Sequence, residues 1–265
     1  MHYLKKSNSD SVLSFENVSF SYHSMQGELK AMENISFSLN KGEFLAIVGP
    51  SGCGKSTLLN LICNLLTPSS GKITFPNLSE DEKPNIGYML QHDHLLEWRT
   101  IWDNVTLGLE IQNKKNEFNL ERVNLLLENY GLSEFKDKHP GELSGGMKQR
   151  AALIRTLALN PDILLLDEPF SALDYQTRLM VSADIGKIIR QTGKTAVLVT
   201  HNLSEAISMA DRIFVFSNRP ATIRKEFQIS LTVTDDSLLG YRNAPEFQTY
   251  FNDIWEVLVD ESRIK

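Results

Sequence analysis

The 265-residue sequence contains little cysteine and little tryptophan. Its two cysteines, Cys53 and Cys63, have no metal-type spacing to other Cys or His residues and are too few for a disulfide framework. Their scarcity favours a reduced, cytosolic setting. Two interpretations of Cys53 stay open: a reactive thiol, since a helix N-terminus lowers thiol pKa values, or a small residue that fills its loop.

Basic residues and long apolar runs are also lacking. Lys and Arg number 27 against 33 Asp and Glu, a net charge of −6, whereas nucleic-acid-binding surfaces are usually basic. We therefore expect no nucleic-acid partner. The longest apolar stretch, 58–66, is interrupted by Asn and is too short to span a bilayer. The first residues, MHYLKKSNSDS, have no apolar core of a signal peptide, so we expect any action at a membrane to need a partner.

Short apolar runs alternate with helical patterns along the chain. Alternation of apolar and polar residues predicts strands within 12–22 and 34–49, with a turn at Lys41-Gly42. Buried parallel strands are expected at 44–48, 86–91, 163–166, 195–199 and 212–216. Helices are expected at 55–65, 119–130, 147–159, 174–191 and 203–210, with stops at Gly131 and Asn160-Pro161. This order predicts an α/β fold.

The middle of the chain, about 92–160, is helical and interrupts the strand alternation. It predicts a helical subdomain inserted into the α/β core. A polar loop is expected at 77–85. After 217 the pattern weakens, and we expect a strand at 223–231 and a helix at 245–259 in an extension that covers the core.

The segment GPSGCGKS matches G-x-x-x-x-G-K-[ST] and lies between an apolar run and a helical pattern. Backbone N–H groups of such a loop wrap the β- and γ-phosphates of a nucleotide, and Lys55 supplies a positive charge. The Ser56 hydroxyl is placed for Mg²⁺, and Thr57 for the α-phosphate. The residues expected to bind nucleotide here are Gly49, Pro50, Ser51, Gly52, Cys53, Gly54, Lys55, Ser56 and Thr57.

The run ILLLDEP ends an apolar strand in two carboxylates. Asp167 is predicted to hold Mg²⁺, and Glu168 to polarise the attacking water as a general base. Alone, such a pair is equally compatible with a solvated strand end. Its position downstream of a phosphate-binding loop favours the functional interpretation.

Two further polar residues end apolar runs. Gln91 is predicted to ligate Mg²⁺ and to sense the γ-phosphate, and His201 to contact the γ-phosphate at the carboxyl edge of the sheet. A helix-cap or core histidine is the alternative for His201. The HDH triplet at 92–94 has alternating residues and no further ligands, which disfavours a tetrahedral metal site.

Tyr22 ends a strand and is predicted to stack on adenine, with a surface tyrosine as the alternative. A second candidate anion site precedes the helical run at 147–159. Ser144, Gly145 and Gly146 stand at the helix start, where free N–H groups and the helix dipole favour an anion. This site has no lysine of the Lys55 kind.

Together these residues resemble the nucleotide-binding subunit of an ABC transporter over about 12–217. The resemblance is carried, in the family's order, by GPSGCGKST, Gln91, LSGGMKQR, ILLLDEP, SALD at 171–174, and His201. It implies a P-loop NTPase (RecA-like) core with an antiparallel β subdomain and an inserted helical subdomain. The implied single ABC ATPase domain, 1–265, divides into an α/β core with the β subdomain (12–91 and 161–217), a helical subdomain (92–160) and a carboxyl-terminal extension (218–265).

The resemblance also implies ATP and Mg²⁺ as cofactors and a head-to-tail homodimer that sandwiches two ATP molecules. In such a dimer Ser144, Gly145 and Gly146 face the γ-phosphate bound by Lys55 of the other subunit, and Asp174 helps to join the two sites. The implied partners are integral membrane permease subunits and, indirectly, an extracytoplasmic substrate-binding protein. The implied location is the cytoplasmic face of the membrane, as a peripheral subunit.

Within the family, Met147, the stretch LLEWRTIWDNVTLGLE, and the closing SNRPATI and PEFQTYFNDIWEVL resemble importers of nitrate, sulfonates, taurine and related solutes. Glu97 departs from that group, which commonly has Pro there, and this leaves the permease's identity open. The alternatives are an exporter subunit, a soluble ABC ATPase acting on DNA or ribosomes, and a generic P-loop kinase or GTPase. The single cassette and the lack of a heptad tract disfavour an ATPase that acts on DNA or ribosomes. LSGGMKQR and SALD have no role in a kinase or GTPase, which disfavours that alternative.

Overall fold

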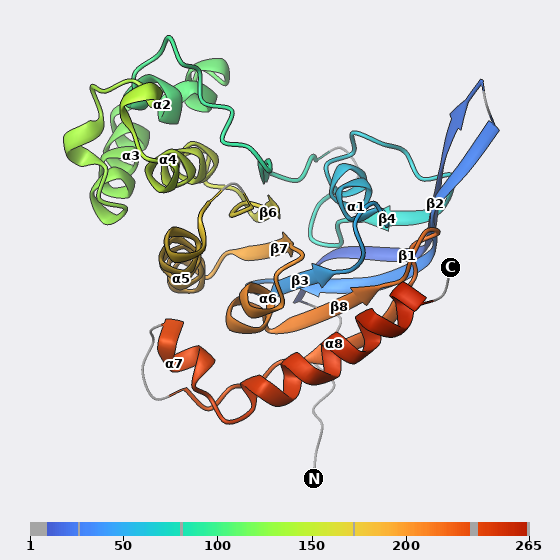
Figure 1. Cartoon of the computed structure of the whole chain (residues 1–265). Helices are drawn as coiled ribbons and strands as arrows, with labels where there is room; N and C mark the ends of the chain where they lie inside the picture. The colour runs from blue at the N-terminus through green and yellow to red at the C-terminus, as the bar shows by residue number, and fades with distance from the viewer. Residues whose placement is uncertain (1–9, 26, 80–81, 172, 234–237, 264–265) are drawn as a thin grey trace. The chain divides into compact units, whose positions relative to one another are not determined.

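The computed structural model describes residues 10–25, 27–79, 82–171, 173–233 and 238–263 (Figure 1). The chain divides into two compact units. The first contains the residues up to Pro84 and those from Thr192 onward, and the second contains Asn85–Gln191. Of the sequence motifs, Ala172 in SALD lies outside the described residues.

The first unit is built from strands and short helices. Its elements are β1 (Ser11–Ser24), β2 (Gly27–Asn40), β3 (Phe44–Val48), α1 (Lys55–Ile62), β4 (Ser70–Thr74), β7 (Thr195–Val199), α6 (Leu203–Met209), β8 (Arg212–Phe216), β9 (Ile223–Gln228), α7 (Leu238–Arg242) and α8 (Phe247–Arg263).

An antiparallel sheet in the order β2-β1-β4 forms one layer of this unit. β1 and β2 pair along most of their length, and the rings of Phe15 and Phe37 stack with centroids 4.7 Å apart. Alternating side chains of β1 are buried at its start, as its sequence pattern predicts. The sheet therefore has a packed face and a solvated face.

The core strands of the first unit follow the order β7-β3-β8-β9. β3 pairs in parallel with β7 and with β8, whereas the edge strand β9 runs antiparallel to β8. Every residue of β3 and β7 is buried, as is typical of parallel strands, and α6 packs against β3. The carboxyl end of β3 leads directly into the glycine-rich loop and α1.

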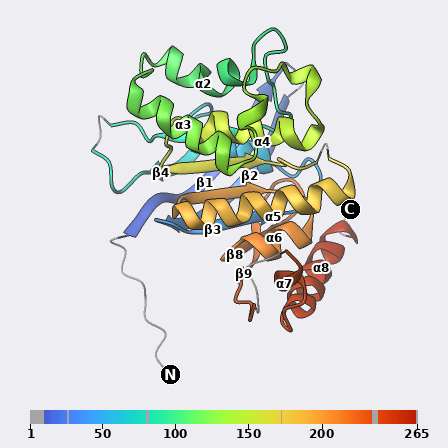
Figure 2. The same cartoon turned by 90° about the vertical axis from the view of Figure 1, so that its left-hand side faces the viewer.

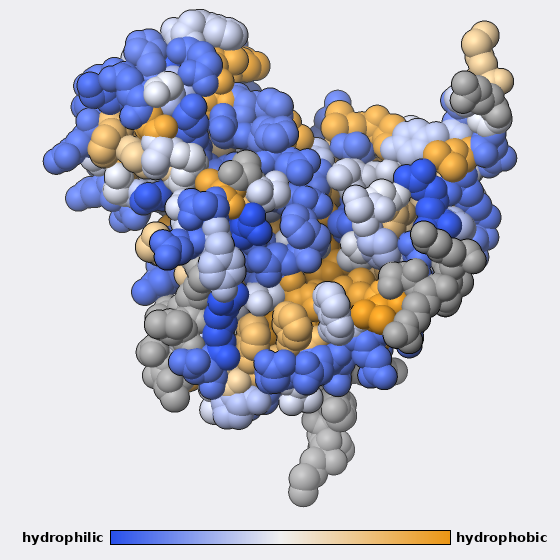
Figure 3. Space-filling view, viewed as in Figure 1, coloured by the Kyte–Doolittle hydropathy of each residue, from blue (hydrophilic) through white to orange (hydrophobic). Residues whose placement is uncertain are grey.

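The carboxyl-terminal segment packs on this core. α8 contacts α6 and β8, and α7 contacts α6. The two views agree that α6, α7 and α8 lie side by side (Figures 1 and 2). Ile254 on α8 is fully buried, whereas hydrophilic residues dominate the outward side of this helix (Figure 3). α8 therefore covers the core with an amphipathic face.

The second unit is mainly helical. Its elements are β5 (Ile86–Met89), α2 (Ile101–Ile111), α3 (Glu117–Asn129), the 3₁₀ turns η2 (Ser133–Phe135) and η3 (Pro140–Glu142), α4 (Gly145–Leu157), β6 (Ile163–Asp167) and α5 (Tyr175–Thr192). β5 and β6 pair in parallel, and α4 packs against both α2 and α3.

The α/β fold class predicted from the sequence is confirmed, and most expected elements are present within a few residues. Some boundaries differ: β2 begins at Gly27 rather than near 34, and β9 ends at Gln228 rather than 231. The sequence patterns predicted neither β4 nor α7. Among the described residues, no helix is long and apolar enough to cross a membrane.

Candidate nucleotide-binding site

The phosphate loop, Gly49–Thr57, connects β3 to the start of α1. Gly54 caps the helix with a φ of 124°, a conformation that side chains rarely allow. The first turn of α1 has no acidic residue, so its N–H groups and dipole favour an anion. The Lys55 Nζ atom donates to the carbonyl oxygens of Gly49 and Pro50, each at 2.9 Å. The lysine thus lies folded over the loop.

Tyr22 and the phosphate loop are in direct contact. The Tyr22 hydroxyl lies 3.0 Å from the Thr57 Oγ1 atom, and the tyrosine is 40% exposed. The Phe20 ring meets the Tyr22 ring edge to face, with centroids 4.8 Å apart. A partly exposed ring fixed beside the loop fits the predicted stacking on a nucleotide base.

His201 belongs to the same unit as the phosphate loop. It follows β7 directly and is exposed, and the helix cap of α6 is the next residue, Asn202. The Asn202 side chain accepts from the N–H groups of Ser204 and Glu205. Capping is therefore done by Asn202, which argues against the helix-cap interpretation of His201.

In the second unit, Asp167 ends β6 and Glu168 follows it. Asp167 is 8% exposed and accepts a hydrogen bond from the Tyr88 hydroxyl at 3.2 Å. Glu168 has a φ of 46°, which is uncommon for a residue with a side chain. The Gln91 Nε2 atom lies 3.5 Å from the Glu168 Oε2 atom. The structure thus brings Gln91 and Glu168 together.

The signature cradle, Ser144 with Gly145 and Gly146, begins α4. Ser144 is the N-cap, and its Oγ accepts from the Met147 N–H at 3.4 Å. The first turn of α4 contains no acidic residue. A Cβ at Gly146 would lie 2.8 Å from the Thr177 Cγ2 atom on α5, so close helix packing requires glycine there. Gly146 therefore allows α4 to pack closely on α5, in addition to leaving backbone N–H groups at the helix start uncovered by a side chain.

Asp174 lies just before α5. Its carboxylate accepts from the N–H groups of Gln176 and Thr177, each at 3.1 Å. The Thr177 side-chain hydrogen bond is the main cause that lowers the pKa of Asp174. Asp174 therefore stays ionised and holds the start of α5.

Two arginines of the second unit hold loops that carry predicted site residues. Arg155 on α4 donates to the carbonyl oxygens of Asp93 and His94, just after Gln91. Arg178 on α5 donates to the carbonyl oxygens of Ser171 and Leu173, beside Asp174. Sequence patterns missed both, because their acceptors are backbone carbonyls that any residue type provides.

A buried asparagine fixes the segment that contains Glu97 and Trp98. Asn104 on α2 is fully buried, accepts from the Leu96 N–H at 2.7 Å and donates to the carbonyl oxygens of Leu96 and Thr100. Glu97 lies 3.7 Å from the Lys148 Nζ atom on α4, and Trp98 is 75% exposed.

Cys53 and the histidine pair His92 and His94 are candidates for thiol chemistry and metal binding. Burial raises the pKa of the Cys53 thiol, while the positive charges of Lys55 and Arg219 act in the opposite direction. The raised pKa favours the loop-filling interpretation over a reactive thiolate. The His92 and His94 rings meet edge to face, and no group of three metal-binding side chains is present in the described part of the chain.

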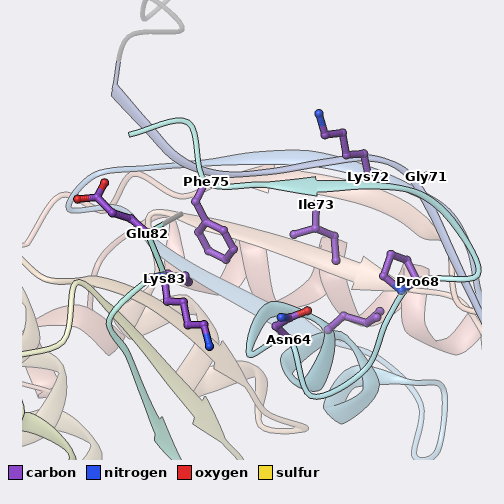
Figure 4. Close-up of a pocket in the computed structure, with 10 residues that line it drawn as sticks. Asn64, Pro68, Gly71, Lys72, Ile73, Phe75, Glu82 and Lys83 are labelled. Atoms are coloured by element: carbon purple, nitrogen blue, oxygen red, sulfur yellow. The ribbon is translucent and has the colours of Figure 1, made fainter. Parts of the chain in front are cut away.

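A separate cavity of about 480 Å³ lies in the first unit between the end of α1 and β4 (Figure 4). Ile73 and Phe75 point into it from the β4 side, and Lys72 points away. None of its lining residues belongs to the predicted nucleotide site. They are Leu61, Asn64, Pro68, Gly71, Lys72, Ile73, Phe75, Glu82, Lys83 and Pro84.

A glycine-rich loop with a lysine, set between a buried parallel strand and a helix, defines a P-loop nucleotide-binding protein. The family model described as "ABC transporter" matches residues 32–171. The chain belongs to this family as an ATP-binding subunit, and it is an ATPase.

Its relatives are similar over nearly the whole chain. An uncharacterized ABC transporter ATP-binding protein, YtlC of Bacillus subtilis, is 46% identical over 94% of this chain and 96% of its own. The taurine import ATP-binding protein TauB of Ruegeria pomeroyi is 40% identical over 82% of each chain. The nitrate import ATP-binding protein NrtD of Synechocystis is 36% identical over 88% of this chain and 90% of its own.

A solved structure has the same fold. It is the dimeric ATP-binding cassette MJ0796, bound to ADP and Pi in a post-hydrolysis state. The two chains are 31% identical with a TM-score of 0.69, over 82% of this chain and 99% of the other. This similarity confirms the P-loop NTPase fold expected from the motifs.

Proposed function

We propose that this chain hydrolyses ATP to power a separate membrane permease that imports a small solute such as taurine, a sulfonate or nitrate. The observation that carries the proposal is the signature cradle, a second helix start besides the phosphate loop with no acidic residue in its first turn, which suits an anion. Kinases and GTPases have no use for such a second site. The taurine and nitrate import relatives support the transport role and the solute class.

In this proposal the phosphate loop holds the phosphates of ATP. Lys55 exchanges the carbonyl oxygens of Gly49 and Pro50 for phosphate oxygens, and the N–H groups at the start of α1 add to the anion site. Tyr22 stacks on the adenine, kept in place by its hydroxyl contact with Thr57.

Three oxygen-bearing side chains suit a magnesium ion: the Ser56 hydroxyl, the Gln91 amide and the Asp167 carboxylate. Hard oxygen ligands are what Mg²⁺ prefers, so the donor set fits this ion. The ion would neutralise charge on the phosphates. Tyr88 orients the Asp167 carboxylate through its hydroxyl.

Glu168 is proposed as the general base that takes a proton from the attacking water. Its left-handed backbone conformation is of the strained kind that clusters at active sites. Gln91 contacts its carboxylate and would orient it. His201 is proposed to donate to the γ-phosphate, where charge develops during hydrolysis.

A second copy of the chain would complete each site. We propose that the signature cradle binds the γ-phosphate held by Lys55 of the partner subunit, and that Asp174 lies at the junction of the two sites. Charge-assisted hydrogen bonds contribute about 1.5–3 kcal/mol each, so ATP binding can stabilise a closed dimer. Hydrolysis then removes the bridging charge and favours opening.

The proposed partners are integral permease subunits at the cytoplasmic face of the membrane, with a substrate-binding protein acting on the permease from the far side. The test is to purify the full chain from membranes through an affinity tag and to identify the co-purified protein. Reconstituted in vesicles, the complex should show ATPase activity that rises with the cognate solute. Co-purification with ribosomes or DNA, and no membrane protein, would overturn the transport proposal.

A further inference from the structure

The loop between β8 and β9, residues 217–222, lies against the phosphate loop within the first unit. A Cβ at Gly54 would lie 3.7 Å from the Ala221 Cβ atom of this loop, and one at Gly49 would lie 3.0 Å from the Cβ atom of Phe216, the last residue of β8. The Arg219 Nη2 atom donates to the carbonyl oxygen of Gly52, at the exposed tip of the phosphate loop. The end of β8 and the β8–β9 loop therefore pack against the phosphate loop at Gly49 and Gly54, and Arg219 bonds to its exposed tip at Gly52.

The β8–β9 loop is itself well fixed. The Ser217 Oγ atom accepts from the Thr222 N–H at 2.8 Å, and its single O–H donor lies within reach of the carbonyl oxygens of Asn218, at 2.8 Å, and Pro220, at 3.1 Å. Ala221 exchanges two backbone hydrogen bonds of 2.9 Å with β2, through Ala31 and Glu33. Arg219 thus projects from a rigid base.

The carboxyl-terminal helix fastens the same loop. Glu261 on α8 is only 5% exposed; its carboxylate accepts from the Asn218 N–H at 3.2 Å and from the Arg224 Nε atom. The Asn218 side chain donates to the Glu261 carbonyl oxygen. Arg219, which reaches Gly52, is the residue directly after Asn218.

We propose that Arg219 is a positioning residue for nucleotide binding, and that α8 holds it in place through Glu261 and Asn218. The contact with Gly52 keeps the loop tip in the conformation that receives phosphate, and the guanidinium adds positive charge beside the anion site. The positive charge of Arg219 lowers the pKa of the neighbouring Cys53 thiol, although burial raises that pKa by more. The electrostatic effect of Arg219 therefore reaches the phosphate loop.

The first test compares the ATP affinity and steady-state kinetics of the full chain with those of Arg219→Gln. The contact is exposed, so we expect KM and the nucleotide dissociation constant to rise about three- to fivefold with kcat nearly unchanged. Amide hydrogen exchange at 50–54 should become faster. Arg219→Lys, which keeps the charge, should restore much of the affinity.

Lys225→Gln is the matched control. It removes a positive charge from β9, where Lys225 is exposed and lies over the Phe227 ring, and it should leave KM unchanged. A fall in kcat with an unchanged KM in Arg219→Gln, or an equal rise of KM in Lys225→Gln, would overturn the proposal.

The second test is a double-mutant cycle with Glu261→Gln, which keeps the shape of the side chain. If α8 acts through Arg219, this variant raises KM about twofold or more, and adding Arg219→Gln raises it no further than Arg219→Gln alone. Additive effects would remove α8 from the proposal.

The inference rests on the proposed role of the phosphate loop. The Lys55→Ala variant distinguishes a failure of that role from a failure of the role of Arg219. If Lys55→Ala binds ATP normally, the role of the loop fails. If Lys55→Ala loses binding while Arg219→Gln binds as the native chain does, only the role of Arg219 fails.

Discussion

The Nε2 atom of Gln91 lies 3.5 Å from the Oε2 atom of Glu168, so an amide two residues after β5 contacts the carboxylate that directly follows the neighbouring strand β6. In the proposed site the amide oxygen would bind the cation while the amide nitrogen orients the carboxylate. This geometry links the residue proposed to detect the γ-phosphate with the proposed base.

Glu168→Gln should nearly abolish hydrolysis while ATP still binds, because a general base contributes about 10²–10⁴ to a rate. The variant should accumulate as an ATP-bound dimer in size-exclusion chromatography. Single-turnover kinetics with ATP measure the loss. Hydrolysis at the native rate would remove Glu168 from the role of base.

Ser144→Arg should block ATP-driven dimerisation and leave ATP binding by the single chain nearly intact, since the bulky side chain would occupy the proposed anion site on α4. Sedimentation with and without ATP measures the effect. Ser144→Ala is the control for the lost helix cap, which costs about 1 kcal/mol of stability. A Ser144→Arg protein that dimerises normally would contradict the shared site.

Gly146→Ala should destabilise the chain by about 1–3 kcal/mol, because the added methyl meets the Thr177 Cγ2 atom at 2.8 Å. Adding Thr177→Ser removes that methyl and should restore part of the stability. Denaturant unfolding measures both. Equal stabilities of Gly146→Ala and the native chain would show that α4 and α5 separate easily.

Tyr22→Ala should weaken ATP binding about tenfold, because stacking on a base contributes about 1–3 kcal/mol. Tyr22→Phe keeps the ring and loses only the hydroxyl contact with Thr57, so it should bind ATP within a few-fold of the native chain. Titration with a fluorescent ATP analogue distinguishes them. Equal affinities for Tyr22→Ala and the native chain would support a surface tyrosine.

Cys53 should react slowly with thiol reagents at pH 8, since burial raises its pKa and leaves little thiolate. The measurement uses a Cys63→Ser chain, so that only one thiol reports. The rate should increase on raising the pH and on unfolding, and ATP should slow it further. Fast labelling of the folded chain at pH 8 would revive the reactive-thiol interpretation.

Periodicity and motifs predicted the fold class, because the buried strands are short apolar runs and the site residues stand at their ends. β4 escaped prediction since SGKIT is mostly exposed and pairs only along one edge of β1. The first half of β2 was missed for a similar reason: Gly27, Glu28, Leu29 and Lys30 are exposed, so pairing with β1 rather than burial makes them a strand.

The supporting contacts of the candidate site were less predictable than its motifs. Arg155, Arg178 and Arg219 each donate to backbone carbonyls of a loop that carries site residues. Every residue type has a backbone carbonyl, so the sequence does not reveal which residue accepts such a hydrogen bond. The three arginines also belong to no motif that defines the chemistry. Only the three-dimensional arrangement reveals them.

The resting contacts of Lys55 have a consequence for the energetics of binding. Two of its three ammonium donors are already bonded to the carbonyl oxygens of Gly49 and Pro50, so in the proposed site phosphate would displace these acceptors. Binding of ATP would therefore exchange the partners of Lys55, with a small net heat from the lysine itself. Discrimination among anions would then depend on charge density, because only a strongly charged oxygen competes well with two neutral carbonyls.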